Sequence, residues 1–184
     1  LGALPKGCSG RSLIAALSPT DVYVDTWLTE ERRSQLLHWN GSAFAVVPLP
    51  PATEEVNGLQ VHDAGLVMLA YGRGPSGNYS DASSAFLLKE GGWERLGVPA
   101  AENTDLLFTG ADGALWRMGR VAERWSASGW ARGFTFDHSS STGYRITDAS
   151  PGTKGELYLV LQGPGSKDHL ACWPGSGDLL WLKG

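Results

Sequence analysis

The sequence predicts an all-β fold built from about four copies of one strand unit. Three observations support this prediction: the composition, a turn that recurs before a strand, and an aromatic hairpin that follows that strand. The 184 residues include 25 glycines and 10 prolines, 42% are apolar and only 18% are charged. Because Gly and Pro supply the φ angles that tight turns require, we expect many short strands and no long helix.

The turn and its strand recur with a period of about 45 residues. Aligning residues 22, 66, 114 and 157 gives steps of 44, 48 and 43 residues. A period of this length indicates a repeat architecture, in which each repeat is one supersecondary unit. The four copies are residues 18–21 before the strand 22–24, 63–65 before 66–69, 111–113 before 114–116, and 151–155 before 156–160.

A hairpin with an aromatic residue follows each of these strands. In the first copy, Asn40-Gly41 predicts a type I′ turn, because both central residues of that turn need a positive φ. In the second copy, Gly91-Gly92 is expected to make the turn. Each unit therefore reads as strand, loop, strand, tight turn and strand. The four hairpins are residues 36–48, 86–99, 125–130 and 172–181.

A repeat of about 45 residues with three or four strands is typical of a β-propeller blade, whose sheet packs against neighbouring sheets. The recurring tryptophans fit this architecture, because a bulky ring can fill the wedge between radially arranged sheets. A β-sandwich would also show short strands, but it would not repeat one strand pair with the same aromatic offsets. We therefore expect a single β-propeller domain, or a partial propeller, over residues 1–184.

The first and third units resemble known propeller repeats. Residues 18–24 and 37–44 with the closing Pro48 look like the blade repeat of bacterial secreted and surface β-propeller proteins. Residues 112–116 and 125–130 are similar to the repeat of tectonin-like propeller lectins. The resemblance covers most of the chain and implies an architecture rather than an activity. It also implies an extracellular, periplasmic or cell-surface location.

The resemblance has two departures. Asp112, Gly113 and Trp116 match part of the Asp-box of sialidase-type propellers, but the other units do not repeat it. Propellers also usually have more than four blades. Four units could close a small ring or form part of a larger ring completed by another chain or a missing segment. We favour the larger ring, because a fragment, like a removed N-terminal signal, would explain why the sequence starts at Leu1 rather than Met.

Cys8 and Cys172 are the only cysteines of the sequence. A disulfide between them would close a loop of more than 160 residues, which the chain-entropy model values at roughly 4 to 5 kcal/mol before strain. Such a bond would imply an oxidising compartment. The alternative is two separate buried thiols, since free cysteine packs as a small hydrophobic residue.

Composition and motifs argue against several classes of function. A net charge of −4 with scattered basic residues gives no surface for a phosphate backbone, so no nucleic-acid partner is expected. No stretch approaches the roughly 20 apolar residues of a membrane span, so we expect a soluble chain. The four histidines match no zinc signature, and no nucleophile elbow, phosphate loop or HExxH pattern occurs. We expect no metal, no cofactor and no catalysis.

Five aromatic residues are the candidate ligand-binding set, because sugars stack their apolar faces on such rings. For each ring, packing between blades is the competing and more common role. The aspartates that precede strands, Asp21, Asp63, Asp112 and Asp148, are interpreted as turn residues that bond to nearby backbone N–H groups. The candidate set is Trp116, Trp125, Trp130, Tyr144 and Trp173.

The leading hypothesis is a non-catalytic binding or assembly module that recognises a protein partner or a glycan through loops on one rim. The first alternative is a propeller lectin with sugar sites between blades. The second is a hydrolase of the sialidase or glycosidase kind, which would need a pair of carboxylates roughly 5 to 9.5 Å apart. Nothing in the sequence marks such a pair.

Overall fold

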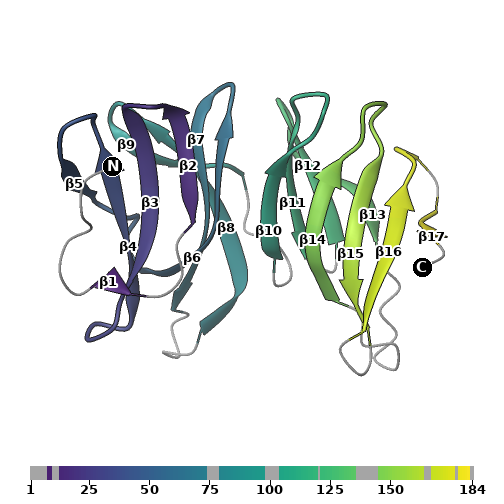
Figure 1. The fold of residues 1–184 in the computed structure, drawn as a ribbon, viewed down its shortest axis with the longest axis horizontal. Helices are drawn as coiled ribbons and strands as arrows, with labels where there is room; N and C mark the ends of the chain where they lie inside the picture. Colours follow the sequence, from purple (N-terminus) through teal and green to yellow (C-terminus); the bar gives the residue numbers. More distant parts are fainter. Residues whose placement is uncertain are drawn as a thin grey trace. The chain divides into compact units, whose positions relative to one another are not determined.

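A computed structural model describes residues 8–9, 13–73, 79–97, 104–119, 121–135, 145–163, 167–176 and 178–182. The regular structure of these residues consists of strands in four antiparallel sheets (Figure 1), which confirms the all-β prediction. None of the described residues forms a helix able to cross a membrane. The chain divides into two compact units, Leu1–Pro99 and Ala100–Gly184, and each contains two sheets.

The first unit contains a five-stranded sheet, β1-β3-β4-β5 with β2 also on β3, and a four-stranded sheet, β6-β7-β8-β9. From β2 to β5 and from β6 to β9 consecutive strands pair as hairpins, in the expected order of strand, turn and strand, whereas β1 pairs with β3 and not with β2. The strands are β1 Cys8–Ser9, β2 Ile14–Ser18, β3 Asp21–Leu28, β4 Arg33–Trp39, β5 Phe44–Val47, β6 Thr53–His62, β7 Gly65–Arg73, β8 Tyr79–Lys89 and β9 Gly92–Arg95.

The two sheets of the first unit pack face to face through a largely aliphatic core. Leu36 on β4 faces Leu66, Met68 and Ala70, which alternate along β7 on one side of their sheet. Phe86 on β8 completes the buried cluster. Residues 66–71 of β7 are all buried, so this strand carries apolar side chains on both faces of its sheet.

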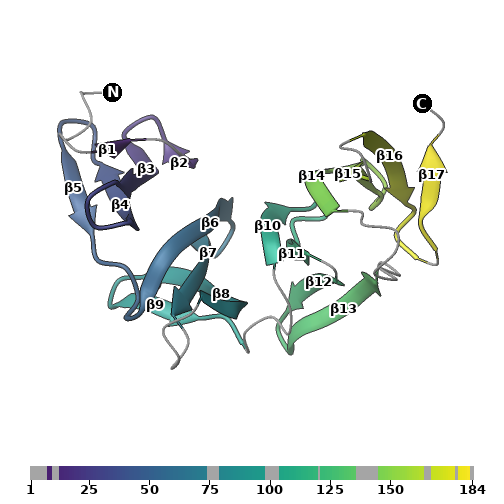
Figure 2. The same cartoon turned by 90° about the horizontal axis from the view of Figure 1, so that it is seen from below.

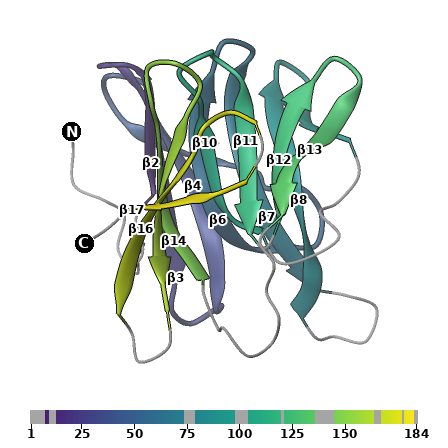
Figure 3. The ribbon, with the colours of Figure 1, turned by 90° about the vertical axis from the view of Figure 1, so that its right-hand side faces the viewer.

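The second unit contains two four-stranded meanders, β10-β11-β12-β13 and β14-β15-β16-β17 (Figure 3). Together with the first unit they give four sheets for the four predicted repeats. The strands are β10 Thr104–Thr109, β11 Leu115–Gly119, β12 Val121–Ser126, β13 Gly129–Thr135, β14 Arg145–Pro151, β15 Leu157–Gln162, β16 Asp168–Trp173 and β17 Leu180–Leu182.

The turn between β4 and β5 differs from its prediction. The loop is closed by a bond from the Asn40 N–H to the Ala43 carbonyl, so the central residues are Gly41 and Ser42. Gly41 has a φ of 91°, and Asn40 does not have a positive φ. The type I′ prediction is therefore wrong; a positive φ at the first central residue alone is the pattern of a type II′ turn. Asn40 instead accepts bonds from the Ser42 and Ala43 N–H groups through its side chain.

Candidate functional site

Trp116 and Trp173, two of the predicted ligand residues, lie in the core of the second unit. They are only 4% and 6% exposed, and their rings meet edge to face with centroids 5.5 Å apart. Phe108 stacks on Trp116 from β10, and Phe134 stacks on Trp173 from β13. The four rings join the two sheets of the unit, which is the packing role that competes with ligand binding for these residues.

Trp125 and Trp130 form a second aromatic pair, on the hairpin of β12 and β13. They face each other in register, with ring centroids 5.1 Å apart, and both are partly exposed. The guanidinium carbon of Arg117 lies 4.3 Å from the Trp130 ring centre, and its Nε donates to Glu123 at 2.7 Å. Arg117 is only 1% exposed, so the ion pair and the ring together accommodate a buried charge.

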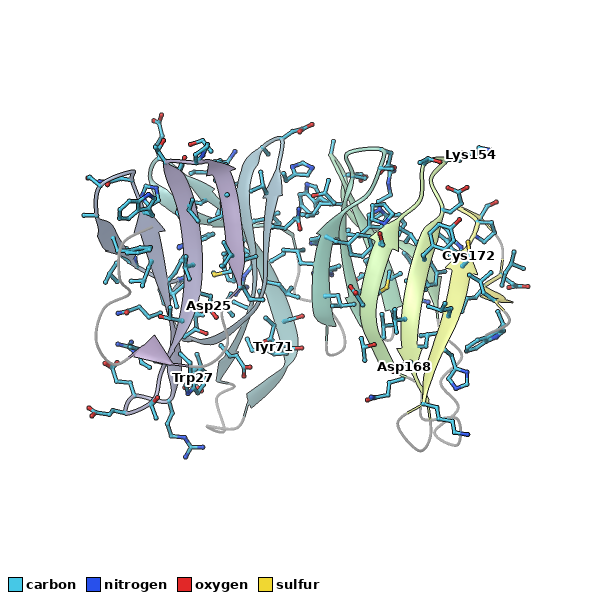
Figure 4. The ribbon with its side chains drawn as sticks, in the orientation of Figure 1. Asp25, Trp27, Tyr71, Lys154, Asp168 and Cys172 are labelled. Atoms are coloured by element: carbon cyan, nitrogen blue, oxygen red, sulfur yellow. The ribbon has the colours of Figure 1, made fainter. Side chains whose placement is uncertain are left out.

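The remaining predicted residues are not brought together by the structure. Tyr144 lies outside the described residues, as does the side chain of Cys8. Cys172 is a free, buried thiol on β16 (Figure 4). The Cys8–Cys172 disulfide and a ligand role for the aromatic set therefore stay predictions. Among the described residues, no group of three or more His, Cys, Asp or Glu is placed to hold a metal ion.

The aspartates that were interpreted as turn residues differ in their hydrogen bonds. Asp112 caps its turn by accepting from the Ala114 N–H at 3.0 Å and pairs with Arg124 at 2.8 Å. Burial raises the pKa of Asp112, but the Ala114 bond and Arg124 outweigh it and hold that pKa below its usual value. Asp21 instead bonds to His38, at 2.8 Å. Asp148 lies inside β14, next to a register shift, and not in a turn before a strand as expected.

The first unit carries a groove that sequence reasoning missed. Its volume is about 460 Å³. Leu28 and residues 33–36 form one wall, and residues 46–53 form the other. Apolar side chains and three prolines dominate these walls, while Arg33, Ser34, Gln35 and Thr53 supply polar groups. An apolar hollow with a few polar groups is the usual form of a binding site.

The residues that line the groove come from the place where the β4–β5 pairing stops. Figure 2 shows the chain passing from β5 to β6. The last paired residues are Leu36 and Val47, and Pro48 follows at once. A proline cannot donate a ladder hydrogen bond, so β5 ends there. β4 continues to Arg33 beyond the last residue that pairs with β5. The three residues 33–35 thus form one wall, and the segment that leads to β6 forms the other.

The 48–53 wall is held in place by several contacts. The Trp93 indole N–H donates to the Pro48 carbonyl at 2.8 Å, and Leu49 packs against the core of the unit. The Thr53 N–H donates to the Pro50 carbonyl at 3.2 Å. Gly72 approaches Ala52 so closely that a Cβ at position 72 would lie 2.6 Å from its carbonyl oxygen. The groove is therefore preformed.

Two non-glycine residues in the described part of the chain have a positive φ, and both belong to this region. Ala52, with φ 63°, lines the groove, and Arg32, with φ 52°, precedes the lining residue Arg33. For a residue with a Cβ this conformation costs roughly 1 to 2 kcal/mol. Such strain often accompanies binding sites, where the surrounding structure holds it in place. The run Pro48-Leu49-Pro50-Pro51 is the sequence signal that could have indicated this region.

No known protein family and no curated protein matches the sequence. Solved structures do match, including a structure of YCF48 bound to D1 peptide, with 16% identity and a TM-score of 0.59 over 97% of this chain. A puromycin hydrolase matches over the whole chain with 17% identity and a TM-score of 0.64. A streptogramin B lyase matches 97% of the chain with 13% identity and a TM-score of 0.50.

These likenesses concern the fold. The chain spans 56% of the YCF48 chain, 70% of the lyase chain and 32% of the hydrolase chain. The three are β-propeller proteins, and the four sheets found here fit propeller blades. The prediction of β-propeller blades is thereby confirmed. Because one fold hosts many functions, the site and not the likeness must carry any statement about activity.

Proposed function

We propose that this chain is a non-catalytic binding module whose groove takes an extended segment of a protein partner. The observation that carries the proposal is the preformed apolar groove beside residues 33–35 of β4. An extended peptide that lies along a strand can add main-chain hydrogen bonds, while neighbouring pockets receive its side chains. The structure of YCF48 bound to D1 peptide supports the proposal, since a protein with this fold there binds a peptide.

The composition of the walls favours a peptide over a sugar. None of the described residues that line the groove is aromatic, so this part of the site offers no ring on which a sugar face could stack. Leu28, Val46, Leu49 and Ala52 offer aliphatic contact instead. Arg33, although it pairs with Glu31, is exposed and gives the groove a basic group at one wall.

A library of random peptides displayed on phage tests this proposal. We expect enrichment of peptides with alternating apolar residues, whose binding to the chain is lost on Val46→Asp. Ile14→Asp is a matched control, because Ile14 and Val46 are both 60% exposed on the same sheet and Ile14 does not line the groove. Peptides that bind both variants equally, or no enrichment at all, would contradict a peptide site here.

A glycan is the second candidate ligand, and the partly exposed Trp125–Trp130 pair favours it. A glycan array would show binding that disappears on Trp125→Ala if this reading holds. The non-catalytic part of the proposal is checked with the purified chain. Turnover of glycoside substrates would overturn it.

The location outside the cytoplasm also belongs to the proposal. If the chain reaches an oxidising compartment, Cys8 and Cys172 can form a disulfide, and the intact mass of the isolated protein would be lower by two hydrogens than after reduction. An unchanged mass would instead support two separate thiols, in agreement with the buried free thiol of Cys172.

A further inference from the structure

The turn between β4 and β5 contains an asparagine that is followed directly by a glycine, Asn40-Gly41. The backbone nitrogen that follows an asparagine can attack the side-chain amide carbon, because the product is a small, unstrained succinimide ring. A glycine at the second position favours this attack, since no Cβ crowds the nitrogen. Residues 40–43 are all exposed, so water reaches this turn.

Three donors converge on the side-chain oxygen of Asn40. Its Oδ1 accepts from the Ser42 N–H at 3.0 Å, from the Ser42 hydroxyl at 2.8 Å and from the Ala43 N–H at 3.0 Å. When a nucleophile adds to Cγ, negative charge develops on this oxygen. Donors that already point at such an oxygen stabilise the transition state, as in an oxyanion hole. The turn is therefore preorganised for attack at the Asn40 Cγ.

The attacking nitrogen and the leaving nitrogen are not held by other groups. Among the described residues, none accepts a hydrogen bond from the Gly41 N–H or from the side-chain NH₂ of Asn40. The Gly41 nitrogen thus has no bond to break before it attacks. The amide nitrogen of Asn40 can leave directly into water.

A second Asn-Gly pair, Asn57-Gly58, provides a contrast within the same chain. It lies inside β6, where Gly58 is buried and pairs with Leu69. The Asn57 Oδ1 is buried, and no group in the described part of the chain donates a hydrogen bond to it. This position has the same dipeptide, but it lacks donors for a developing charge and its side-chain oxygen is shielded from water.

We propose that Asn40 and Gly41 form a site of self-modification in the folded protein. The Gly41 nitrogen loses its proton and bonds to the Asn40 Cγ, the Cγ–Nδ2 bond breaks, and Nδ2 leaves with that proton as ammonia. Water then opens the succinimide. Attack on Cγ gives aspartate, and attack on the main-chain carbonyl carbon gives isoaspartate. The sum is hydrolysis of a side-chain amide, and water is the one co-reactant.

Both products change the hairpin of β4 and β5. Each adds a carboxylate at position 40, and isoaspartate also adds a methylene to the main chain where β4 turns into β5. β5 carries Val46 and Val47, which line the groove. The reaction therefore alters a hairpin that supplies part of the groove wall, and the inference does not depend on what the groove binds.

Peptide mapping by mass spectrometry tests the inference. The full folded chain is kept in mildly alkaline buffer and digested at intervals under acidic conditions, which suppress the reaction during handling. The peptide with Asn40 should gain the mass difference between OH and NH₂, and an isoaspartyl methyltransferase should label it. We expect conversion at Asn40 to be at least about tenfold faster than at Asn57. A rate at Asn40 no higher than that at Asn57 overturns the inference.

Ser42→Ala isolates the role of the donors. It removes the hydroxyl that donates to Asn40 and keeps the N–H of residue 42. Loss of one oxyanion-hole donor slows enzymes by about 10²–10³, and in this exposed turn we expect a smaller loss of about threefold to tenfold. Ser128→Ala, in the exposed β12–β13 turn, is the matched control and should leave the rate unchanged. Unchanged or faster conversion in Ser42→Ala would show that the bonds only restrain Asn40, and would overturn the inference.

A denatured sample separates structure from local sequence. Unfolded in guanidinium chloride, the two Asn-Gly pairs should convert at similar rates, because neither then has a fixed environment. Unchanged urea midpoints confirm that the serine variants fold. If the preference for Asn40 persists in the unfolded chain, neighbouring residues in the sequence cause it, and the structural inference fails.

Discussion

The two units use the same hairpin sheets but fill their cores differently. In the first unit, aliphatic side chains such as Leu36, Leu66 and Met68 fill the space between sheets, and among the described residues Phe86 is the one aromatic member of the fully buried cluster. In the second unit, four contacting rings join the aliphatic residues of the cluster: Phe108, Trp116, Phe134 and Trp173. In the first unit, Trp93 is partly exposed and bonds to Pro48 beside the groove. A repeated tryptophan thus has a packing role in one unit and a positioning role in the other.

The largest effect is expected from Trp116→Ala in the second unit. Removing a buried tryptophan costs about 4 kcal/mol, because burial is lost and a cavity remains. Urea unfolding followed by hydrogen exchange should show lost protection of β11 and β15. If the strands of the first unit lose as much protection, the two cores unfold together. The two units would then not differ in stability as separate cores.

Leu36→Ala is the corresponding change in the first unit. Leu36 is fully buried on β4, and its truncation should cost about 3 kcal/mol of unfolding free energy. Hydrogen exchange should now report lost protection of β4 and β7. A cost below 1 kcal/mol would mean that the aliphatic core collapses around the gap, unlike a core of rigid rings.

Gly133→Ala sharpens the description of the ring cluster. A Cβ at position 133 would lie 2.6 Å from the Trp116 ring, so the ring or β13 must shift. Overpacking of this kind costs about 2 kcal/mol. Gly129→Ala is not a suitable control, because Gly129 has a positive φ. Gly91→Ala is better, since no described residue lies within 4 Å of its added Cβ. Equal urea midpoints for Gly133→Ala and Gly91→Ala would contradict the close contact between position 133 and the Trp116 ring.

Trp93→Phe tests the positioning role in the first unit. The ring remains, but the bond to the Pro48 carbonyl is lost, which should cost about 1 kcal/mol. Peptide affinity at the groove should fall while Trp125→Phe leaves it unchanged. Loss of stability without loss of affinity would show that the bond does not position the groove.

The smallest effect concerns the turn before β11. Asp112→Ala removes the cap of Ala114 and the partner of Arg124, and it should cost about 1 kcal/mol at neutral pH. Because the folded pKa of Asp112 is lowered, its contribution is present above the unfolded pKa and is lost as pH falls through the folded pKa. The difference between wild type and variant should therefore shrink in acid. If the difference in stability between wild type and variant does not change with pH, the charge of Asp112 does not contribute, and the loss comes from the turn alone.

The sequence was informative where one repeat predicted the next. The recurring turns and aromatic hairpins located the strands, and the period near 45 residues indicated blades. The turn at Asn40 was mispredicted because the asparagine side chain caps the loop, which shifts the central positions to Gly41 and Ser42. Local dipeptide preference does not include that competing bond.

The site was less predictable than the fold. The tryptophan pattern indicated rings, but not that Trp116 and Trp173 meet each other in a core while Trp125 and Trp130 stay partly exposed. That choice depends on which face of each strand is buried, and so on pairing across the sheet. The groove depends on where β5 stops along β4, a tertiary fact that the proline run only suggests.

The edge-to-face contact of Trp116 with Trp173 also has a spectroscopic consequence. Two indoles held at 5.5 Å and 70° in an apolar surrounding form a coupled pair of chromophores. The near-ultraviolet circular dichroism of the protein should therefore contain a signal from the second unit that vanishes when its two sheets separate. Each tryptophan belongs to a different sheet of that unit, so the chain carries its own optical reporter of how these sheets pack.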